Sequence, residues 1–419
     1  MKTLIIGSGL LGLTTAYYLS KQGVAVTVID RAEGPGMETS FANGAALTPG
    51  MTDPWNAPGV LRKLIQWLGK EDAPLLLRMH ALPSLIGWGW LFLRNSSPEA
   101  FRRNLKKNAA LAAYSMQTLK TLREETGINY QQASRGTMKV FRDQSAIQSA
   151  IDLAQLVEEY GISHKVLSKE QVIRTEPALT GIADSVAGGL YFPGDEAGDA
   201  YLFCQQLRAL CEKQGVRFDF NTHVEGFKQS SNRITSIVTN HTHYEADSVV
   251  LAAGSHSQIL ARSVGVRLPI RPAKGYSITV PRGDWQDAPQ IPVVDDQLHA
   301  VVTPVGDRIR VAGTAEFTGF DLSINPGRIN NLQRLLQAIY PDFAAKLDAQ
   351  DITPWAGFRP MTADSVPILG KTKMDNLFLN TGHGHLGWTM AAGSGKAVAG
   401  VMLGQKAGLG VEAYGLKRF

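Results

Sequence analysis

The first 30 residues of the chain carry a pattern that few folds accommodate. The apolar run Thr3–Ile6 precedes the glycine-rich segment Gly7–Gly12 (GSGLLG), and Leu13–Gln22 has the pattern of a helix. A second apolar run, Val24–Ile29, ends in Asp30. This order of strand, GxGxxG, helix, strand and acid predicts a Rossmann-like βαβ unit, and therefore an α/β fold.

The small residues of this motif have separate physical roles. Gly7 permits the tight turn, Gly9 lets backbone N–H groups approach a pyrophosphate, and Gly12 lets the helix pack against the strand. The helix N-terminus offers partial positive charge to phosphates, and Asp30 can accept hydrogen bonds from a ribose. A purely structural glycine-rich turn is the alternative, and the motif alone does not separate FAD from NAD. The expected dinucleotide-binding residues are Gly7, Ser8, Gly9, Leu10, Leu11, Gly12, Asp30 and Arg31.

Two later segments favour FAD over NAD. Ser248–Gly254 (SVVLAAG) reads as a buried strand that ends in small residues, and no second GxGxxG with a following helix marks a separate NAD domain. Leu377–Asn380 reads as another strand, and Thr381–Thr389 (TGHGHLGWT) leads into a helix from about Met390 to Leu403. Its glycines allow close approach to a flat ring, and the helix N-terminus can stabilise negative charge on a reduced flavin. An ordinary glycine-rich loop is the alternative.

With these motifs in this order, the chain resembles the FAD-dependent amine oxidoreductases of the D-amino-acid oxidase and glycine oxidase superfamily, and most closely the bacterial D-amino-acid dehydrogenases. The resemblance covers nearly the whole chain. Besides GSGLLG and VTVIDR it rests on TSFANGAALTPG (residues 39–50), WNAPGV, GDEAGD, SVVLAAGSHS, KGYSITV, WAGFRPMTADSVPILG and GHGHLGWTMAAGSG. Asp30 and His385 depart from it, because many relatives carry Glu at the first position and many D-amino-acid dehydrogenases carry a small hydroxyl residue at the second.

The resemblance implies a non-covalently bound FAD that three further groups of residues contact. Ser40, Asn43, Gly44 and Thr48 would lie along the ribityl chain and the isoalloxazine ring. Val224 would bind adenine through its backbone, and Ala253 and Gly254 would pass near the phosphates or ribose. The residues expected to cover the flavin ring are Gly382, Gly384, His385, Leu386, Gly387, Trp388 and Thr389.

Three side chains are the main candidates for contact with the substrate, and His299 is a fourth. Arg359, in GFRP, matches the arginine that holds the substrate carboxylate in related enzymes, and its planar fork suits a carboxylate; a structural ion pair with Asp364 is the alternative. Tyr276 can orient the carboxylate or amine through its hydroxyl, or be a core tyrosine. His385 can contact substrate or flavin, or face solvent. His299 lies where relatives place active-site side chains, but an exposed strand histidine is the commoner case.

The implied reaction is the oxidative deamination of D-amino acids to 2-oxo acids and ammonia, by hydride transfer from the α-carbon to flavin N5. Such an oxidoreductase, acting on CH–NH2 donors, needs positioning, and neither a nucleophile nor a metal site is expected. The resemblance favours transfer of the electrons to a quinone or another acceptor, although the motifs leave oxidase and dehydrogenase open. A D-hydroxyproline- or proline-type dehydrogenase and a glycine or sarcosine oxidase are alternatives within the superfamily.

The resemblance also implies two interleaved domains. A discontinuous FAD-binding domain is expected at about residues 1–55, 195–265 and 352–419. A substrate domain with a mixed, largely antiparallel sheet and flanking helices is expected at 110–194 and 266–351.

Between these parts, residues 56–109 form a basic, Trp-rich insertion. The chain has 42 Lys+Arg and 37 Asp+Glu, a net charge of +5, yet residues 61–107 alone hold nine basic and three acidic residues. The stretch from residue 55 to 107 also holds Trp55, Trp67, Trp88 and Trp90, four of the seven tryptophans. Lys and Arg beside apolar residues and Trp are typical of a peripheral membrane contact. A packed lid or a subunit interface is the alternative.

The remaining composition narrows the class of protein. With 44% hydrophobic and 19% charged residues the chain is ordinary for a globular protein, which excludes wholesale disorder. Cys204 and Cys211 are the two cysteines, seven apart on an expected helix, and reduced core thiols fit a reducing compartment. We therefore expect a cytoplasmic protein, associated with the inner face of the membrane if the basic segment binds lipid. No nucleic-acid-binding motif accompanies the basic charge.

Overall fold

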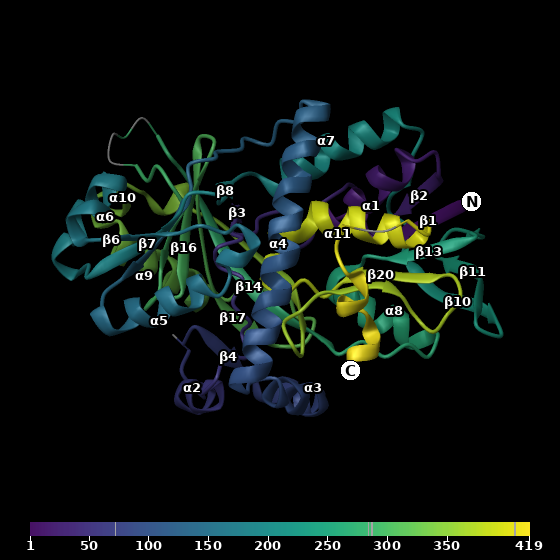
Figure 1. The fold of residues 1–419 in the computed structure, drawn as a ribbon, viewed down its shortest axis with the longest axis horizontal. Helices are drawn as coiled ribbons and strands as arrows, with labels where there is room; N and C mark the ends of the chain where they lie inside the picture. Colours follow the sequence, from purple (N-terminus) through teal and green to yellow (C-terminus); the bar gives the residue numbers. More distant parts are fainter. Residues whose placement is uncertain (72, 284, 286–287, 406–407) are drawn as a thin grey trace.

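The computed structural model describes the chain except for residues 72, 284, 286–287 and 406–407. Two sheets dominate it, one in each half of the molecule, and the long helix α4 (Pro98–Thr126) runs between them (Figure 1). Ser97 caps the start of α4 through its hydroxyl, and Gly127 ends it with a left-handed φ of 65°. The residues Ser97-Pro98-Glu99 predict a helix start with a cap and a proline at its first position, and the predicted helix runs to Gly127, so both ends are confirmed.

The first sheet has six strands in the order β19-β20-β13-β1-β2-β9, and β19 alone runs antiparallel to its neighbour. The parallel register places Ile6 beside Leu251, and Leu251 beside Leu379, so the carboxyl ends of three strands meet at one edge. The glycine-rich segments that follow these strands therefore lie together. The strands are β1 (Lys2–Ile6), β2 (Ala25–Ile29), β9 (Arg217–Asp219), β13 (Ser248–Leu251), β19 (Ile368–Lys371) and β20 (Leu377–Thr381).

Helices α1 (Leu10–Ser20) and α11 (Gly387–Met402) pack against each other beside this sheet, together with α4 and α7 (Ala200–Lys213). The two helices approach each other closely at Gly395, where an added Cβ would lie 2.5 Å from the hydroxyl of Thr14. Both helices begin three residues earlier than predicted, inside their glycine-rich motifs, since the glycines themselves adopt the first helical turn. Cys204 and Cys211 are buried free thiols on α7. A three-stranded sheet of β10 (Val224–Ser230), β11 (Arg233–Thr239) and β12 (His243–Tyr244) and helix α8 (Ser257–Ser263) complete this half.

The second sheet has nine strands and is mixed but largely antiparallel, as predicted. Its order is β18-β14-β17-β16-β15-β5-β7-β6, with β4 pairing parallel to β17. Four helices, α5 (Gln144–Gln155), α6 (Lys169–Thr175), α9 (Pro326–Ile339) and α10 (Pro341–Ala344), lie with it in the left half of Figure 1. The strands are β4 (Leu75–Leu77), β5 (Thr137–Phe141), β6 (Lys165–Leu167), β7 (Gly188–Phe192), β14 (Ile270–Pro281), β15 (Val293–Asp295), β16 (Ala300–Val305), β17 (Arg308–Phe317) and β18 (Thr353–Thr362).

The Trp-rich insertion forms α2 (Val60–Trp67), β4 and α3 (Leu82–Arg94) at the lower edge of Figure 1. It is anchored to the second sheet through β4 and through Trp88, whose ring nitrogen donates to the carbonyl of Met361 at 3.1 Å. Two short strands, β3 (Ala46–Leu47) and β8 (Glu196–Ala197), pair with each other.

The α/β class with two sheets is confirmed. The proposed domain limits stay a prediction, supported by the origin of the six-stranded sheet in residues 2–29, 217–251 and 368–381.

Candidate active site

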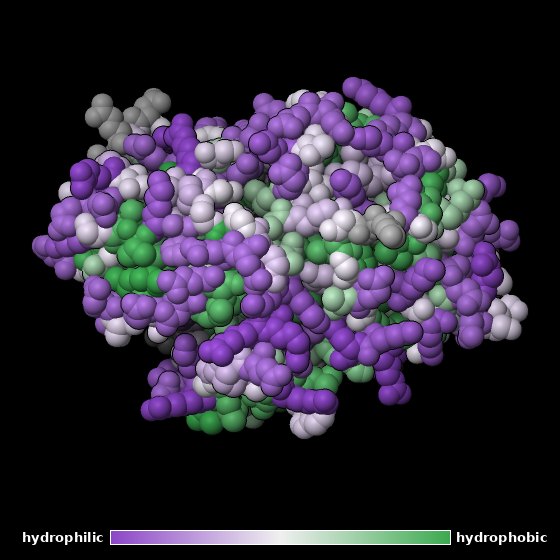
Figure 2. Space-filling view, viewed as in Figure 1, coloured by the Kyte–Doolittle hydropathy of each residue, from purple (hydrophilic) through white to green (hydrophobic). Residues whose placement is uncertain are grey.

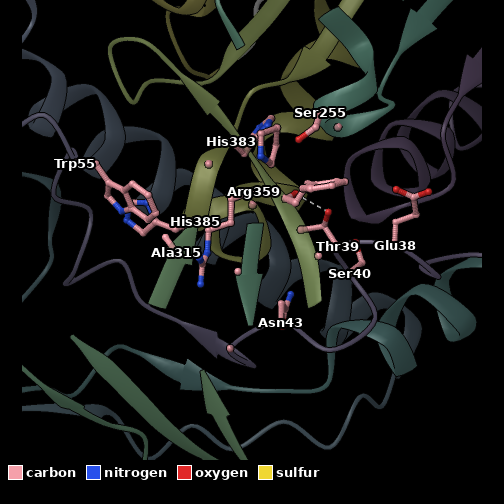
Figure 3. A pocket seen from close by; sticks show the side chains of 18 of the residues that line it. Glu38, Thr39, Ser40, Asn43, Trp55, Ser255, Ala315, Arg359, His383 and His385 are labelled. Carbon is pink, nitrogen blue, oxygen red and sulfur yellow. Dashed lines mark hydrogen bonds between the residues drawn. The ribbon is translucent and has the colours of Figure 1, made fainter. Parts of the chain in front are cut away.

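One continuous cavity of about 1050 Å³ joins the carboxyl edge of the first sheet to the face of the second. Figure 3 shows Glu38 and Ser255 toward one end of it and Trp55 with His385 toward the other. The first end is the nucleotide end, because β1, β2 and β13 deliver the GxGxxG motif, Asp30 and Ala253 there. The second end is lined by β14, β17 and β18 and by the insertion.

The nucleotide end has the tight backbone that a pyrophosphate needs. Gly7 has a φ of 109°, and a Cβ there would lie 2.6 Å from the carbonyl oxygen of Ala252, so no other residue fits. The backbone N–H and hydroxyl of Ser8 donate to one carboxylate oxygen of Asp30 at 2.6 and 2.7 Å. Asp30 therefore fixes the loop and lines the cavity as well.

Most of the predicted cofactor residues line this cavity. Five do not: Ser8, Gly12, Gly382, Leu386 and Thr389 lie behind the lining, where they support it. Thr389, for example, accepts a hydrogen bond from the N–H of Thr48 at 3.0 Å through its hydroxyl. The residues that do line it are Gly7, Gly9, Leu10, Leu11, Asp30, Arg31, Ser40, Asn43, Gly44, Thr48, Val224, Ala253, Gly254, Gly384, His385, Gly387 and Trp388.

The segment around Asn43 and Gly44 is held against β16 and β17 of the second sheet. The carbonyl of Asn43 accepts from Arg310 and that of Gly44 from the hydroxyl of Thr303, both at 2.8 Å. Arg310 is buried, and burial lowers the pKa of its guanidinium to about 10. The glycine cradle and the length of the cavity fit a flavin dinucleotide, with its phosphates at Gly7–Gly12 and its ring near Gly44.

Arg359 projects from β18 across its neighbouring strand. A Cβ at Gly275 would lie 2.5 Å from its guanidinium, and its Nη1 donates to the carbonyl of Thr314 at 3.1 Å. Asp364, the alternative partner, is paired instead with Arg418 at 2.7 Å. Among the residues that the structure describes, Arg359 has no acidic partner, and burial lowers its pKa to about 10. Its remaining donors are free for an anion in the cavity.

His385 stacks on Trp55 with ring centroids 5.6 Å apart, and Arg359 lies 5.8 Å from the Trp55 ring. His385 lines the cavity, and its side chain is exposed there. Burial, and then the charge of Arg359, lower its pKa to about 3, so the imidazole is neutral at physiological pH. The neutral imidazole of His385 can donate one hydrogen bond and accept another, but it carries no charge.

Tyr276 also lines the cavity, but its hydroxyl is already engaged. It donates to a carboxylate oxygen of Glu316 at 2.6 Å, and burial is the first cause of its raised pKa. Its role toward the substrate stays a prediction, and this contact favours the core alternative. His299 lines the cavity too, 6.1 Å from the ring of Trp67, and burial lowers its pKa.

Sequence reasoning missed several residues of the lining. His383 is buried, shares a 2.8 Å hydrogen bond with Ser394, and has a pKa lowered to about 3 by burial. It belongs to the same GHGH segment as His385, so the motif contained the signal. Asp53, Lys139 and Asp296 line the far end, and nothing in their local sequence marks them.

A dinucleotide cradle that opens into a cavity lined by the second sheet is the arrangement of a nucleotide-dependent oxidoreductase. The sequence matches the family described as FAD dependent oxidoreductase over residues 2–401. The chain belongs to this family, and its cofactor is FAD.

The relatives agree with this assignment. The chain is 43% identical over 420 residues to a D-amino acid dehydrogenase of Paramagnetospirillum magneticum, covering 100% of this chain and 99% of the relative. It is 40% identical to D-amino acid dehydrogenase 1 of Mesorhizobium japonicum, covering both chains fully at 100%.

Solved structures share the fold at lower identity. L-proline dehydrogenase from P. horikoshii superposes with a TM-score of 0.79 at 19% identity, covering 100% of this chain and 97% of the other. Glycine oxidase from Geobacillus kaustophilus gives 0.78 at 21% identity, with 100% and 98% covered.

Proposed function

We propose that this enzyme is a D-amino-acid dehydrogenase that converts D-amino acids to 2-oxo acids and ammonia. Arg359 carries the proposal, because its guanidinium lines the cavity without an acidic partner among the described residues, and an α-carboxylate fits its fork. The two D-amino acid dehydrogenases named above, which match this chain over their full length, support D-amino acids as the substrate class. FAD, when bound, takes up the electron pair released from the amine carbon.

The residues of the chain position the substrate. Arg359 holds the carboxylate, while Trp55 and neutral His385 form the adjoining wall, so the α-carbon is directed toward the ring site near Gly44. Orientation of this kind removes much of the entropic barrier to the reaction. A glycine or sarcosine oxidase and a proline- or hydroxyproline-type dehydrogenase remain alternatives within the superfamily, and the long cavity beyond Arg359 favours larger side chains than glycine.

A spectrum of the purified protein tests this proposal. We expect a yellow protein that is bleached anaerobically by D-amino acids, and not by L-, N-methyl or cyclic amino acids at comparable rates. Slow oxygen consumption in the same assay is expected for a dehydrogenase. Bleaching by sarcosine or proline alone would contradict the proposal and favour an alternative.

We infer further that the electrons pass to a quinone and that the insertion touches a membrane. Figure 2 shows apolar side chains at the lower edge of the molecule, below α2 and α3, beside strongly hydrophilic ones. Ile65, Ile86 and Trp90 are 66%, 74% and 62% exposed there. Basic residues of the same segment would face anionic headgroups, which suits a peripheral contact at the inner face of the membrane. In the part of the chain that the structure describes, no helix has the length and apolar character of a membrane span.

A further inference from the structure

The cavity continues beyond Arg359 to charged side chains that oxidation at the α-carbon does not use. Asp53, Lys139 and Asp296 line this far end. Asp53 precedes the Trp55 wall by two residues, Lys139 lies on β5, and Asp296 directly follows β15. They line the same cavity as Arg359, and Asp53 is joined through the chain to Trp55, whose ring lies 5.8 Å from the Arg359 guanidinium.

The strand order places Asp296 two strands away from Thr314 and Lys139 three strands away. Gly313 pairs with Ala300 and Ala300 with Asp295, so Thr314 and Asp296 each lie one residue beyond this row, Asp296 at the start of the turn between β15 and β16. Thr314 is the residue whose carbonyl accepts from Arg359. Neighbouring strands lie about 4.8 Å apart, so Asp296 is about 10 Å from this contact and β5 about 14 Å. A long, extended side chain is needed to cover that distance.

The charges at the far end do not cancel. Lys139 is bound to Asp296 at 2.7 Å, which leaves Asp53 without a hydrogen-bond or ion-pair partner among the residues described. The pKa of Asp53 is raised, first by burial, with the charge of Lys139 lowering it and that of Asp296 raising it, so a cation beside Asp53 would favour its ionised form. Asp295 points away to Arg142 at 2.8 Å. The side chain of Lys63 lies at the exposed mouth on α2, near His299.

An unpaired carboxylate away from bulk water carries a free-energy penalty of desolvation, and a cation that enters the cavity offsets this penalty. We propose that Asp53 selects substrates with a cationic side chain, so that D-amino acids ending in an ammonium or guanidinium group are preferred. This inference rests on the proposed function. Lysine and arginine have stems of about three or four methylene groups, which carry the charged group well beyond a carboxylate held by Arg359. The carboxylate of an acidic substrate would be repelled by Asp53. Lys139 would not offset this repulsion, because it is paired with Asp296.

Two substrate pairs of matched shape test the inference on the holoenzyme. D-arginine is compared with D-citrulline, and D-lysine with D-norleucine, by anaerobic flavin reduction. We expect kcat/KM to be about tenfold to a hundredfold higher for the cationic member, as for a hydrogen bond to a charged group. Asp53→Asn should abolish this preference and leave D-norleucine within about twofold. Asp307→Asn, which removes an exposed carboxylate in the turn before β17, should retain it.

A binding measurement that needs no turnover accompanies the kinetics. 5-Guanidinopentanoate and its neutral analogue 5-ureidopentanoate lack the α-amino group and cannot be oxidised. Calorimetry should show at least tenfold tighter binding of the guanidino acid to the wild type, and no difference for Asp53→Asn. An unchanged flavin spectrum confirms that the variant is folded and loaded.

The outcomes separate this inference from the proposed function. If no amino acid reduces the flavin, the proposed function is wrong and the inference falls with it. If neutral D-amino acids react as well as cationic ones, or if D-glutamate reacts fastest, the proposed function stands and the role of Asp53 is overturned. A preference for D-arginine that persists in Asp53→Asn also overturns it.

Discussion

The guanidinium of Arg359 is committed to one backbone carbonyl, that of Thr314, and leaves its other donors toward the cavity. We predict that Arg359→Ala raises the KM for D-amino acids about a hundredfold, because two charge-assisted hydrogen bonds are lost. Arg359→Lys keeps the charge but loses the fork, and should raise KM about tenfold. Steady-state kinetics measure both effects, with bound flavin as the control. An unchanged KM in Arg359→Ala would contradict the assignment.

His385 is neutral because burial and Arg359 lower its pKa to about 3. The pH profile of kcat/KM between about pH 6 and 9 should therefore be the same in His385→Thr as in the wild type, apart from its height. A lowered folded pKa also means that the unfolded chain takes up this proton first, near pH 6.5. The free energy of unfolding should therefore fall as the pH drops from about 6.5 toward 3, and it should fall less in His385→Thr than in the wild type. Loss of a neutral-pH ionisation in His385→Thr would show that the imidazole titrates in catalysis.

At the scale of elements, the packing of α1 against α11 holds the GxGxxG loop and the GHGH segment in place. A Cβ at Gly395 would lie 2.6 Å from the backbone of Thr14, which cannot give way as a flexible side chain would. Gly395→Ala should lower the free energy of unfolding by about 1–3 kcal/mol and reduce the FAD content. Gly87→Ala is the matched control, since that helical glycine has open space around it and should gain up to about 1 kcal/mol. Thermal unfolding of the two variants measures the difference.

The insertion is the other element whose role can be tested alone. We predict that the wild type floats with anionic liposomes at low salt and much less at about 0.5 M salt, because screening weakens the basic contribution. Ile86→Ser combined with Trp90→Ser should lose most of the binding. Val166→Ser removes a similarly exposed apolar side chain, 51% exposed on β6, and should bind as the wild type does. Absence of flotation for the wild type at low salt would contradict the membrane contact.

At the scale of the whole molecule, local motifs were predictable from the sequence and long-range assemblies were not. The GxGxxG loop, the caps of α4 and the glycine-rich start of α11 follow from neighbouring residues, so their elements were placed within a few residues. The Asp53, Lys139 and Asp296 group depends instead on how β5 pairs with β15, a register between strands far apart in the chain. Likewise, only the fold shows that Asp364 is paired with Arg418.

An anaerobic titration of the purified holoenzyme measures the proposed reaction itself. We predict that a D-amino acid bleaches the flavin with one 2-oxo acid and one ammonia released per flavin reduced, while the L-enantiomer leaves the spectrum unchanged. Bleaching by the L-enantiomer alone, or bleaching by D-amino acids without release of a 2-oxo acid, would contradict it.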